Sequence, residues 1–324
     1  MIPNLLAVVA GMVSATLYIV GLSGSAWGLF MVFLSPLPIF LAGLGGGGTA
    51  SGIAGAVAVI AAFLTSAADP LLGSVFSVFF VLPAFLISHL AMQSREDKDG
   101  KTHWFPLNAM LQLLVIIGLF DVVLVSVLLG LSEDGLVETI QNNLQILVSA
   151  LYGESEPAEY AELVSQWDSL VMGAVIATVM VSLACCGALA QGLLVNTGRN
   201  LRPSPAFWRM AMPTWAVIGG LLCLLIAFLA EDILGTEHWV VFLTYVTTGF
   251  TLVFIVGFLL QGLAVMHGMT RGLSFQFLIL TAVYMIVIVF QPFGALTFAA
   301  IGLADRWGNF RERFGPGTDP EMED

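Results

Sequence analysis

One carboxylate, Asp121, stands inside an otherwise apolar run of the sequence, residues 107–131. It lies about 14 residues into that run, and at about 1.5 Å per helical residue this places it near the middle of a bilayer core about 30 Å thick. A charged side chain is costly at that depth, so Asp121 marks a candidate site. Two interpretations stay open: a ligand for an ion, a proton or a substrate cation facing a cavity, and a carboxyl that pins two helices by hydrogen bonding.

Prolines and glycines interrupt the second apolar stretch of the chain. Pro36 and Pro38 fall inside residues 27–45, and a proline removes a backbone donor and clashes with the turn before it. Four consecutive glycines follow: Gly45, Gly46, Gly47 and Gly48. Unwound backbone at depth is tolerated only where it is buried or lines a cavity. The pattern therefore predicts either tight helix packing or a broken helix that lines a substrate site.

Amide side chains are the remaining polar candidates inside the apolar runs. Gln112 lies nine residues before Asp121, on the opposite face of the same helix, and Gln291 stands beside Pro292 near the end of a later run. Hydrogen bonding between helices is the alternative role for such amides. The candidate substrate-binding residues are Asp121, Gly45, Gly46, Gly47, Gly48, Pro36, Pro38, Gln112 and Gln291.

The cysteines and histidines do not have the spacing of a metal site. The three cysteines lie inside apolar runs without a Cys-x-x-Cys motif, which is typical of small packing residues. The four histidines are scattered, each at the end of an apolar segment. Metalloprotease and serine-hydrolase motifs are missing, and a two-carboxylate mechanism needs a second carboxylate beside Asp121. We therefore expect no metal, no cofactor and no enzymatic activity.

The composition restricts the class of protein. Of 324 residues, 58% are hydrophobic and 10% are charged, against about 25% charged in an ordinary soluble domain. The mean hydropathy is +0.97, and so few charges cannot coat a water-soluble fold of this size. The sequence excludes a soluble enzyme, a disordered protein and a nucleic-acid binder.

The fold class expected is all-α, a polytopic transmembrane helical bundle of about 8 to 10 spans. The candidate spans are residues 2–21, 27–45, 49–64, 71–92, 107–131, 170–194, 214–230, 240–265, 275–290 and 293–305. The second is uncertain because of its prolines, and the last is short for a full crossing. We expect the membrane domain to cover residues 1–314 and the acidic tail 315–324 to be disordered.

All ten basic residues fall into alternate connections, which sets the expected orientation. They are Arg95, Lys98, Lys101, Arg199, Arg202, Arg209, Arg271, Arg306, Arg311 and Arg313. The connections between them hold acids and no base. Because basic loops stay in the cytoplasm, both termini are predicted to be cytoplasmic. This requires residues 275–290 and 293–305 to form a hairpin that turns at Gln291-Pro292.

The largest outer connection, residues 132–167, has apolar residues at helical spacing. Leu136, Ile140, Leu144 and Leu147 predict an amphipathic helix that lies on the membrane surface. It could be a solvated cap or a lid over an outward-facing pocket.

Three stretches resemble a known bacterial family. They are Pro36-Leu37-Pro38 before the glycine-rich turn, Trp104-Phe105-Pro106 at the entry to the fifth span, and Gln291-Pro292 followed by Gly302-Leu303-Ala304-Asp305-Arg306-Trp307 and Phe310-Arg311. Together they resemble the YybS-like multispanning membrane proteins (domain of unknown function 2232). That family is grouped with the substrate-binding components of energy-coupling-factor vitamin transporters, so the resemblance implies a related helical transport fold. It carries no vitamin-binding residue over to this sequence.

Two functions of different classes follow. The first is a transport or small-molecule-binding component of a bacterial cytoplasmic (inner) membrane, in contact with membrane lipid. The sequence has no nucleotide-binding motif, so ATP-driven transport would need partner proteins, and the small-residue face of Ala7, Gly11 and Ala15 could dock one. Contact with a neighbouring helix of the same chain is the simpler interpretation of that face. The alternative function is a non-transporting membrane scaffold or envelope-organisation protein.

Overall fold

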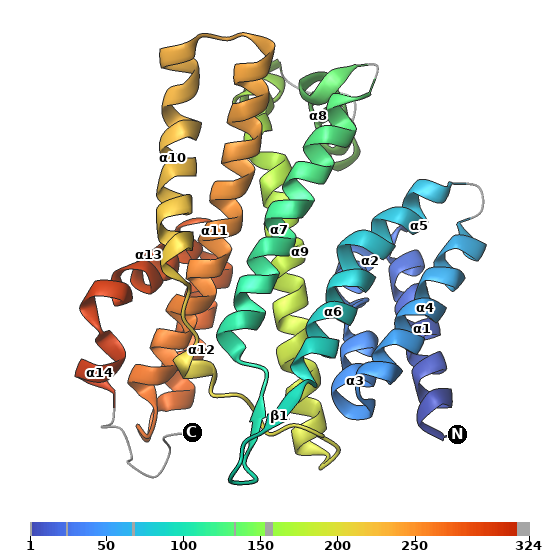
Figure 1. Cartoon of the computed structure of the whole chain (residues 1–324). Helices are drawn as coiled ribbons and strands as arrows, with labels where there is room; N and C mark the ends of the chain where they lie inside the picture. The colour runs from blue at the N-terminus through green and yellow to red at the C-terminus, as the bar shows by residue number, and fades with distance from the viewer. Residues whose placement is uncertain (1, 24, 67–68, 133, 153–157, 316–324) are drawn as a thin grey trace. The chain divides into compact units, whose positions relative to one another are not determined.

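Apolar runs fold as helices in this chain because a helix satisfies its own backbone donors and acceptors without water. The computed structural model describes residues 2–23, 25–66, 69–132, 134–152 and 158–315 (Figure 1). Within these ranges eight helical segments are long and apolar enough to cross a membrane. The protein is therefore a polytopic all-α membrane protein, as the composition predicts. The predicted tail 315–324 lies, beyond Gly315, outside the described residues.

The chain divides into two compact units. The first contains residues 1–114 and 178–206, and the second contains residues 115–177 and 207–324. Two long helices, α7 (Leu107–Gly130) and α9 (Ala158–Asn196), contribute residues to both units. Each unit is described separately below.

The first unit is built around α1 (Ile2–Gly21) and α4 (Gly48–Thr65), which pack closely against each other. Gly11 makes this possible, because a Cβ at that position would lie only 2.8 Å from the Val57 Cβ and closer still to the Ala54 carbonyl oxygen. Ala7 and Ala15 are buried on the same face of α1. The small-residue face of α1 therefore contacts a helix of the same chain.

Prolines shape the other helices of the first unit. The predicted second span is two helices, α2 (Ala26–Leu34) and α3 (Leu37–Gly46), separated at Ser35-Pro36. The fourth span consists of α5 (Pro70–Phe76), a π-helical turn η1 (Ser77–Val81) and α6 (Leu82–Ala91). Pro83 stands at the start of α6. Because proline cannot donate to the preceding turn, a π-helical turn before it relieves the mismatch.

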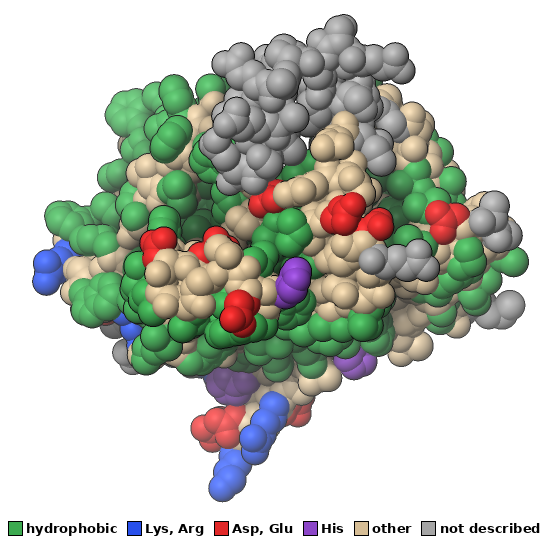
Figure 2. Space-filling view, turned by 90° about the horizontal axis from the view of Figure 1, so that it is seen from above, with side chains coloured by type: hydrophobic (Ala, Val, Ile, Leu, Met, Phe, Trp, Pro, Cys, Tyr) green, Lys and Arg blue, Asp and Glu red, His purple; other side chains and the backbone are tan. Residues whose placement is uncertain are grey.

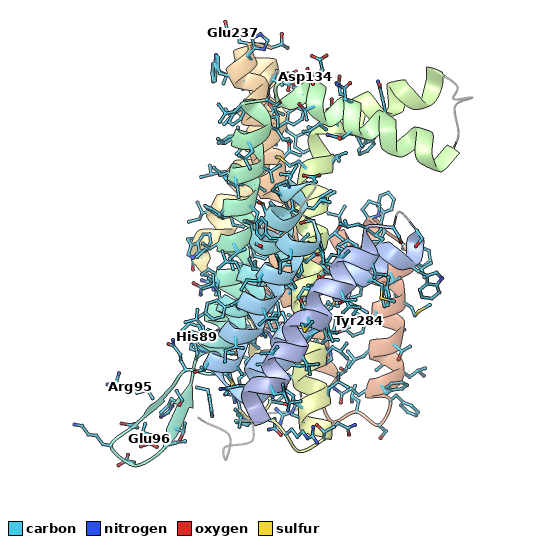
Figure 3. All side chains as sticks on the ribbon, turned by 90° about the vertical axis from the view of Figure 1, so that its right-hand side faces the viewer. His89, Arg95, Glu96, Asp134, Glu237 and Tyr284 are labelled. Carbon is cyan, nitrogen blue, oxygen red and sulfur yellow. The ribbon has the colours of Figure 1, made fainter. Side chains whose placement is uncertain are left out.

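A short hairpin follows α6. Strand β1 (Ser94–Glu96) pairs antiparallel with β2 (Thr102–Trp104), with Arg95 opposite His103. The hairpin projects beyond the helix that carries His89, and Arg95 and Glu96 lie on it (Figure 3).

Arg202 ties this hairpin to the loop after α9. Arg202 is 6% exposed, and its guanidinium donates to the carbonyls of Ala91 and Phe105, each at 2.9 Å. Burial lowers the pKa of this guanidinium from its ordinary value. Arg202 thus caps the C-terminus of α6, where a positive charge is favourable. It is a buried structural residue rather than a side chain exposed to lipid head groups.

The second unit is organised around α11 (His238–Thr270), most of which is buried. It packs along α10 (Thr214–Leu234), which stands beside it in Figure 1, and against α13 (Phe293–Gly308). Gly262 of α11 and Gly302 of α13 meet at a backbone-to-backbone crossing. A Cβ on Gly302 would lie 2.6 Å from the Gly262 nitrogen. Glycine is required here because the two helix backbones are in contact.

Gln261 holds the same crossing by hydrogen bonds. It is 2% exposed, accepts from the Met212 backbone N–H at 2.7 Å and donates to the Gly302 carbonyl at 2.7 Å. Hydrogen bonding between helices is a usual role for an amide inside a membrane protein. Gln191 donates instead to the loop carbonyl of Arg202.

The end of the chain forms the predicted hairpin, but its arms are short. Helix α12 (Gln276–Val289) has 14 residues and α13 has 16, and the peptide bond between Gln291 and Pro292 joins the turn between them. At about 1.5 Å per residue neither arm crosses a core of about 30 Å. Among the described residues, eight helical segments are therefore long enough to span, at the lower end of the predicted 8 to 10, and a hairpin of two short helices follows them.

The hairpin of α12 and α13 brings the chain back to the C-terminal end of α11, from which the hairpin starts. Asp305 receives hydrogen bonds from Arg311 at 2.6 and 3.0 Å and from the backbone N–H of Phe310, which opens α14 (Phe310–Phe314). Arg311 packs against Gly268 near the end of α11. The basic residues of this unit after Arg271 thus lie on the same side as Arg271, as the charge pattern requires. Asp134 and Glu237 lie at the opposite end of the unit (Figure 3).

The predicted amphipathic helix is α8 (Gly135–Tyr152), which leaves the direction of the long helices of its unit and runs sideways (Figure 3). Leu136 and Ile140 are buried, and Gln141 donates to Asp168 of α9 at 2.8 Å. The predicted segment is helical, with its first two apolar positions buried. Carboxylates appear among the side chains seen from above, and hydrophobic side chains cover the flanks (Figure 2).

Candidate functional site

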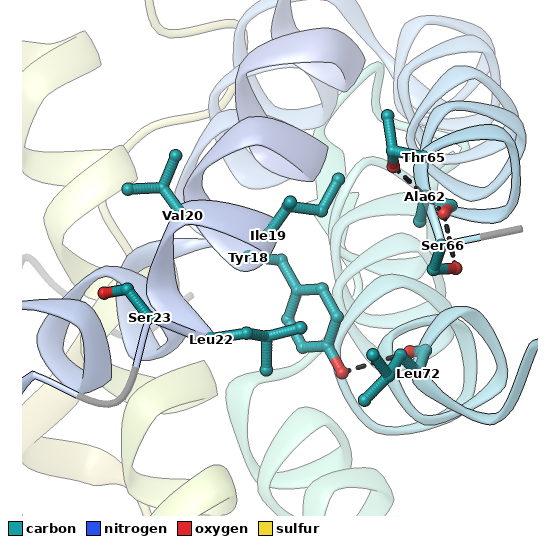
Figure 4. A pocket seen from close by; sticks show the side chains of 9 residues that line it. All are labelled: Tyr18, Ile19, Val20, Leu22, Ser23, Ala62, Thr65, Ser66 and Leu72. Carbon is teal, nitrogen blue, oxygen red and sulfur yellow. Dashed lines mark hydrogen bonds between the residues drawn. The ribbon is translucent and has the colours of Figure 1, made fainter. Parts of the chain in front are cut away.

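The first unit contains an open hollow of about 380 Å³ at the ends of three helices (Figure 4). Side chains from the end of α1, the end of α4 and the start of α5 surround it. Its lining residues are Tyr18, Ile19, Val20, Leu22, Ser23, Ala62, Thr65, Ser66 and Leu72. Its volume falls in the range of small-molecule sites, about 300–1,000 Å³.

Tyr18 connects the three helices around the hollow. It lies in the last turn of α1, is 3% exposed, and donates from its hydroxyl to the Leu72 carbonyl at 3.0 Å. Its ring stacks on Phe76 of α5 with 4.4 Å between ring centroids. A buried tyrosine normally finds a partner for its hydroxyl, and here that partner fixes the start of α5 against α1.

Two hydroxyl groups at the rim of the hollow, those of Thr65 and Ser66, donate their hydrogens to backbone carbonyls. Thr65 donates to the Ala61 carbonyl at 2.7 Å, and Ser66 donates to the Ala62 carbonyl at 2.7 Å. A hydroxyl keeps two acceptor lone pairs after it donates. The hollow therefore offers apolar walls and hydrogen-bond acceptors, and none of its lining residues is charged.

The hollow lies at the end of the first unit away from the basic hairpin. Leu72 is near the start of the 22-residue helical segment Pro70–Ala91, and β1 follows the other end of that segment. If the loops that carry Arg95, Lys98 and Lys101 are cytoplasmic, the hollow faces the outer side.

The backbone carbonyls at the break around Pro36 and Pro38 accept hydrogen bonds from side chains of the same chain. Both prolines are buried. The carbonyl of Phe33, next to the break, accepts from Ser182 at 2.5 Å and from the Cys186 thiol at 3.3 Å. The Ser35 carbonyl accepts from Ser14 at 2.6 Å. These carbonyls, which a substrate could otherwise use, are occupied by the protein's own donors.

The four glycines form a tight turn between α3 and α4. Gly47 alone separates the two helices, with φ of 87°, a conformation that favours glycine. Gly43 and Gly48 provide close contact with α6, where a Cβ on Gly48 would lie 3.0 Å from the Cε1 atom of His89. Gly45, Gly46 and Gly48 lie in close contact with other side chains, which fits the tight-packing interpretation, whereas an added Cβ on Gly47 would have nothing within 4 Å. None of the four lines the hollow.

Asp121 lies in the second unit and is 2% exposed. Among the described residues no hydrogen bond or ion pair reaches its carboxyl. The next residue, Val122, packs against Gly249 of α11, so this face of α7 is turned toward the core of the unit. A role in pinning helices by hydrogen bonding has no described partner to support it. Asp121 stays a candidate ligand for a proton or a cation.

The two predicted amide residues belong neither to the hollow nor to the surroundings of Asp121. Gln112 is half-buried in the first unit. Gln291 is exposed in the second unit and donates to its own helix at the Val287 carbonyl, at 2.6 Å. The predicted residues are thus divided between the units: prolines, glycines and Gln112 in the first, Asp121 and Gln291 in the second.

The residues of the hollow were missed by the sequence reasoning. Tyr18 gave the one available signal, because it is a tyrosine within a span of otherwise small and aliphatic residues. Thr65, Ser66 and Ser23 stand where spans end, and hydroxyl residues are ordinary at such positions.

Fold and composition define a multi-pass membrane protein made of helices. The chain belongs to a family described as "Predicted membrane protein (DUF2232)", whose model matches residues 7–306. No curated protein and no solved structure matches the chain.

Proposed function

We propose that this protein is a membrane component that binds a small molecule in the hollow of its first unit. The observation that carries the proposal is the hollow itself, which is open, largely apolar and held in shape by the hydrogen bond from Tyr18 to Leu72. Few well-formed apolar concavities with a few polar groups occur in a protein, and they are the usual places for ligands.

The chemistry of the hollow indicates its ligand. The walls favour an uncharged and mainly apolar molecule. The hydroxyl oxygens of Thr65 and Ser66 retain acceptor capacity, so the ligand should carry N–H or O–H donors. A charged ligand would meet no opposite charge among the lining residues and would lose its hydration.

We place the protein in a bacterial cytoplasmic membrane, with the hollow outward and the basic ends inside, in a binding rather than an enzymatic role. The sequence resemblance to the YybS-like proteins, a family grouped with the substrate-binding components of energy-coupling-factor transporters, favours the binding role. The chain has no nucleotide-binding motif, so uptake driven by ATP would require partner membrane proteins that hydrolyse it.

The test is a thermal-shift screen of the purified protein against uncharged, mainly apolar small molecules with N–H or O–H donors, vitamins among them, with amino acids and metal ions as charged comparison compounds. A ligand at 100 times its Kd stabilises the folded protein by about 2.7 kcal/mol. Thr65→Val should abolish the shift because it removes an acceptor from the rim. Thr16→Val is the matched control, since Thr16 is also exposed and donates to the carbonyl four residues earlier, but does not line the hollow.

The outcomes separate the alternatives. A shift lost in Thr65→Val and kept in Thr16→Val supports the proposal. A shift that instead disappears in Asp121→Asn would move the site to the second unit. If no compound stabilises the protein, the proposal fails.

A second candidate function is a membrane scaffold, which the projecting hairpin favours. Residues from Arg95 to His103 are exposed and carry both signs of charge, which suits a soluble protein partner better than a lipid surface. Cross-linking from Lys98 would capture such a partner in cells. Exchange of the residues between β1 and β2 for a glycine-serine turn should then abolish the capture.

A further inference from the structure

An exposed stripe along α1 leads to the hollow of the first unit. Val20 forms part of the α1 wall of the hollow (Figure 4), and its side chain is 55% exposed. It is the last of five exposed residues that are spaced three or four positions apart, which places them on one face of the helix. They are Leu5, Val9, Val13, Thr16 and Val20. Exposed apolar side chains of a membrane-spanning helix face lipid hydrocarbon, so the hollow borders the lipid at Val20.

The hollow lies at the level of the lipid head groups. Val9 precedes Val20 by 11 residues, which is about 16 Å along a helix, close to the thickness of one leaflet, about 15 Å. Gly28 of α2 packs against the end of α1, where its Cβ would lie 2.6 Å from the Gly21 carbonyl oxygen. The neighbouring Trp27 is 77% exposed, and exposed tryptophans gather at the boundary between hydrocarbon and water. A lipid chain on the stripe would therefore bring its head group to the hollow.

The charge around the hollow favours a neutral head group. The sequence has no lysine or arginine before Arg95, so α1 to α6 offer no such side chain to a phosphate. A carboxylate stands beside the hollow instead. The backbone N–H of Asp69 donates to the carbonyl of the lining residue Ser66 at 2.8 Å, and its carboxylate accepts from the Leu71 N–H at 3.0 Å. This negative charge repels an anionic head group.

We propose that the ligand of the hollow is an uncharged lipid whose head group carries hydroxyl groups and whose chain lies along the exposed stripe of α1. This inference rests on the proposed function, because it names the class of molecule that the hollow takes and the side from which it enters. The hydroxyl oxygens of Thr65 and Ser66 accept hydrogen bonds from the head group. The apolar walls cover its carbon skeleton, and Asp69 excludes acidic lipids of the same chain length.

The experiment measures ligand retention by native mass spectrometry on the delipidated full chain. The detergent has an amine-oxide head, which has no O–H or N–H donor to compete for the hollow. Monooleoylglycerol, methyl oleate, oleyl sulfate and glycerol are titrated separately. The first three have the same hydrocarbon chain and differ in the head group, and glycerol is the head group without a chain. Monooleoylglycerol should bind more tightly than each of the others by about tenfold or more, the effect of two hydrogen bonds.

Two substitutions separate the roles of the hydroxyls and of the carboxylate. Ser66→Ala should weaken monooleoylglycerol binding about fivefold. Ser74→Ala is the matched control and should change it less than about twofold, since Ser74 also donates to the carbonyl four residues earlier but does not line the hollow. Asp69→Asn removes the charge and keeps a residue that caps a helix equally well. It should raise the affinity for oleyl sulfate about two- to fivefold and leave that for monooleoylglycerol unchanged.

Three results would overturn the lipid proposal: equal retention of monooleoylglycerol and methyl oleate or oleyl sulfate, equal binding of glycerol without a chain, or equal losses in Ser66→Ala and Ser74→Ala. Failure of this proposal is distinct from failure of the proposed function. If a water-soluble compound stabilises the protein in a manner that depends on Thr65 while monooleoylglycerol is not retained, the hollow is a ligand site but not a lipid site. Unfolding temperatures establish that each variant folds, and Thr65→Val replaces Ser66→Ala if the latter does not.

Discussion

The crossing of α11 and α13 predicts a large effect for the smallest possible substitution, Gly302→Ala. The added Cβ would lie 2.6 Å from the Gly262 nitrogen and closer still to the Phe258 carbonyl oxygen, so the helices must separate. Forced overpacking in a core costs about 1–3 kcal/mol. Separation would also stretch the hydrogen bond from Gln261 to Gly302, worth about 1 kcal/mol. We expect a loss of about 3 kcal/mol in the free energy of unfolding.

The assay is thermal unfolding in detergent, where each kcal/mol shifts Tm by about 2–4 °C for a unit of this size. Gly302→Ala should therefore lower Tm by about 6–12 °C. Gly192→Ala is the matched control: this helical glycine of α9 has nothing within 4 Å of an added Cβ. Alanine there should leave Tm unchanged or raise it, because alanine is favoured over glycine in a helix by up to about 1 kcal/mol. Equal Tm values for the two variants would refute the backbone contact on which the reasoning rests.

Three further substitutions test other contacts by the same measurement. Gln261→Leu leaves the Met212 N–H and the Gly302 carbonyl unpaired and should cost about 2–5 kcal/mol; a change below 1 would contradict the two hydrogen bonds. Ser182→Ala should cost only about 1 kcal/mol, because the Phe33 carbonyl keeps the thiol of Cys186. Asp121→Asn should change stability by less than about 1 kcal/mol, since no described partner depends on its charge; a loss above 2 would show that the carboxyl pins two helices.

Much of the fold follows from the sequence because lipid imposes few solutions. A run of about 20 apolar residues has to be a helix, and the runs at 2–21 and 107–131 match α1 and α7 within one residue. The alternation of basic and acidic connections required a terminal hairpin at Gln291-Pro292, and the structure contains it. Charge and hydropathy act over whole segments, so they can be read without knowledge of the contacts.

Contacts between helices were harder to predict from the sequence. The length of α9, 39 residues, exceeds the predicted span because its first turns are polar and belong to the outer connection. The π-helical turn η1 depends on how Pro83 is accommodated, which hydropathy does not report. Asp305 and Arg311 form an ion pair, although the sequence shows them only as opposite charges six positions apart.

The candidate site shows why residue type alone misleads inside a membrane protein. Prolines and glycines marked the stretch around Pro36 as a candidate site, yet Ser14 and Ser182 supply hydrogen-bond donors to the carbonyls at this break. The rim of the hollow holds ordinary hydroxyl residues, yet their oxygens keep acceptor capacity at an open surface. A buried polar group without capacity to spare cannot recognise a ligand, whatever its type. The useful question for each polar atom is therefore which of its bonds are already made, and only the packed structure answers it.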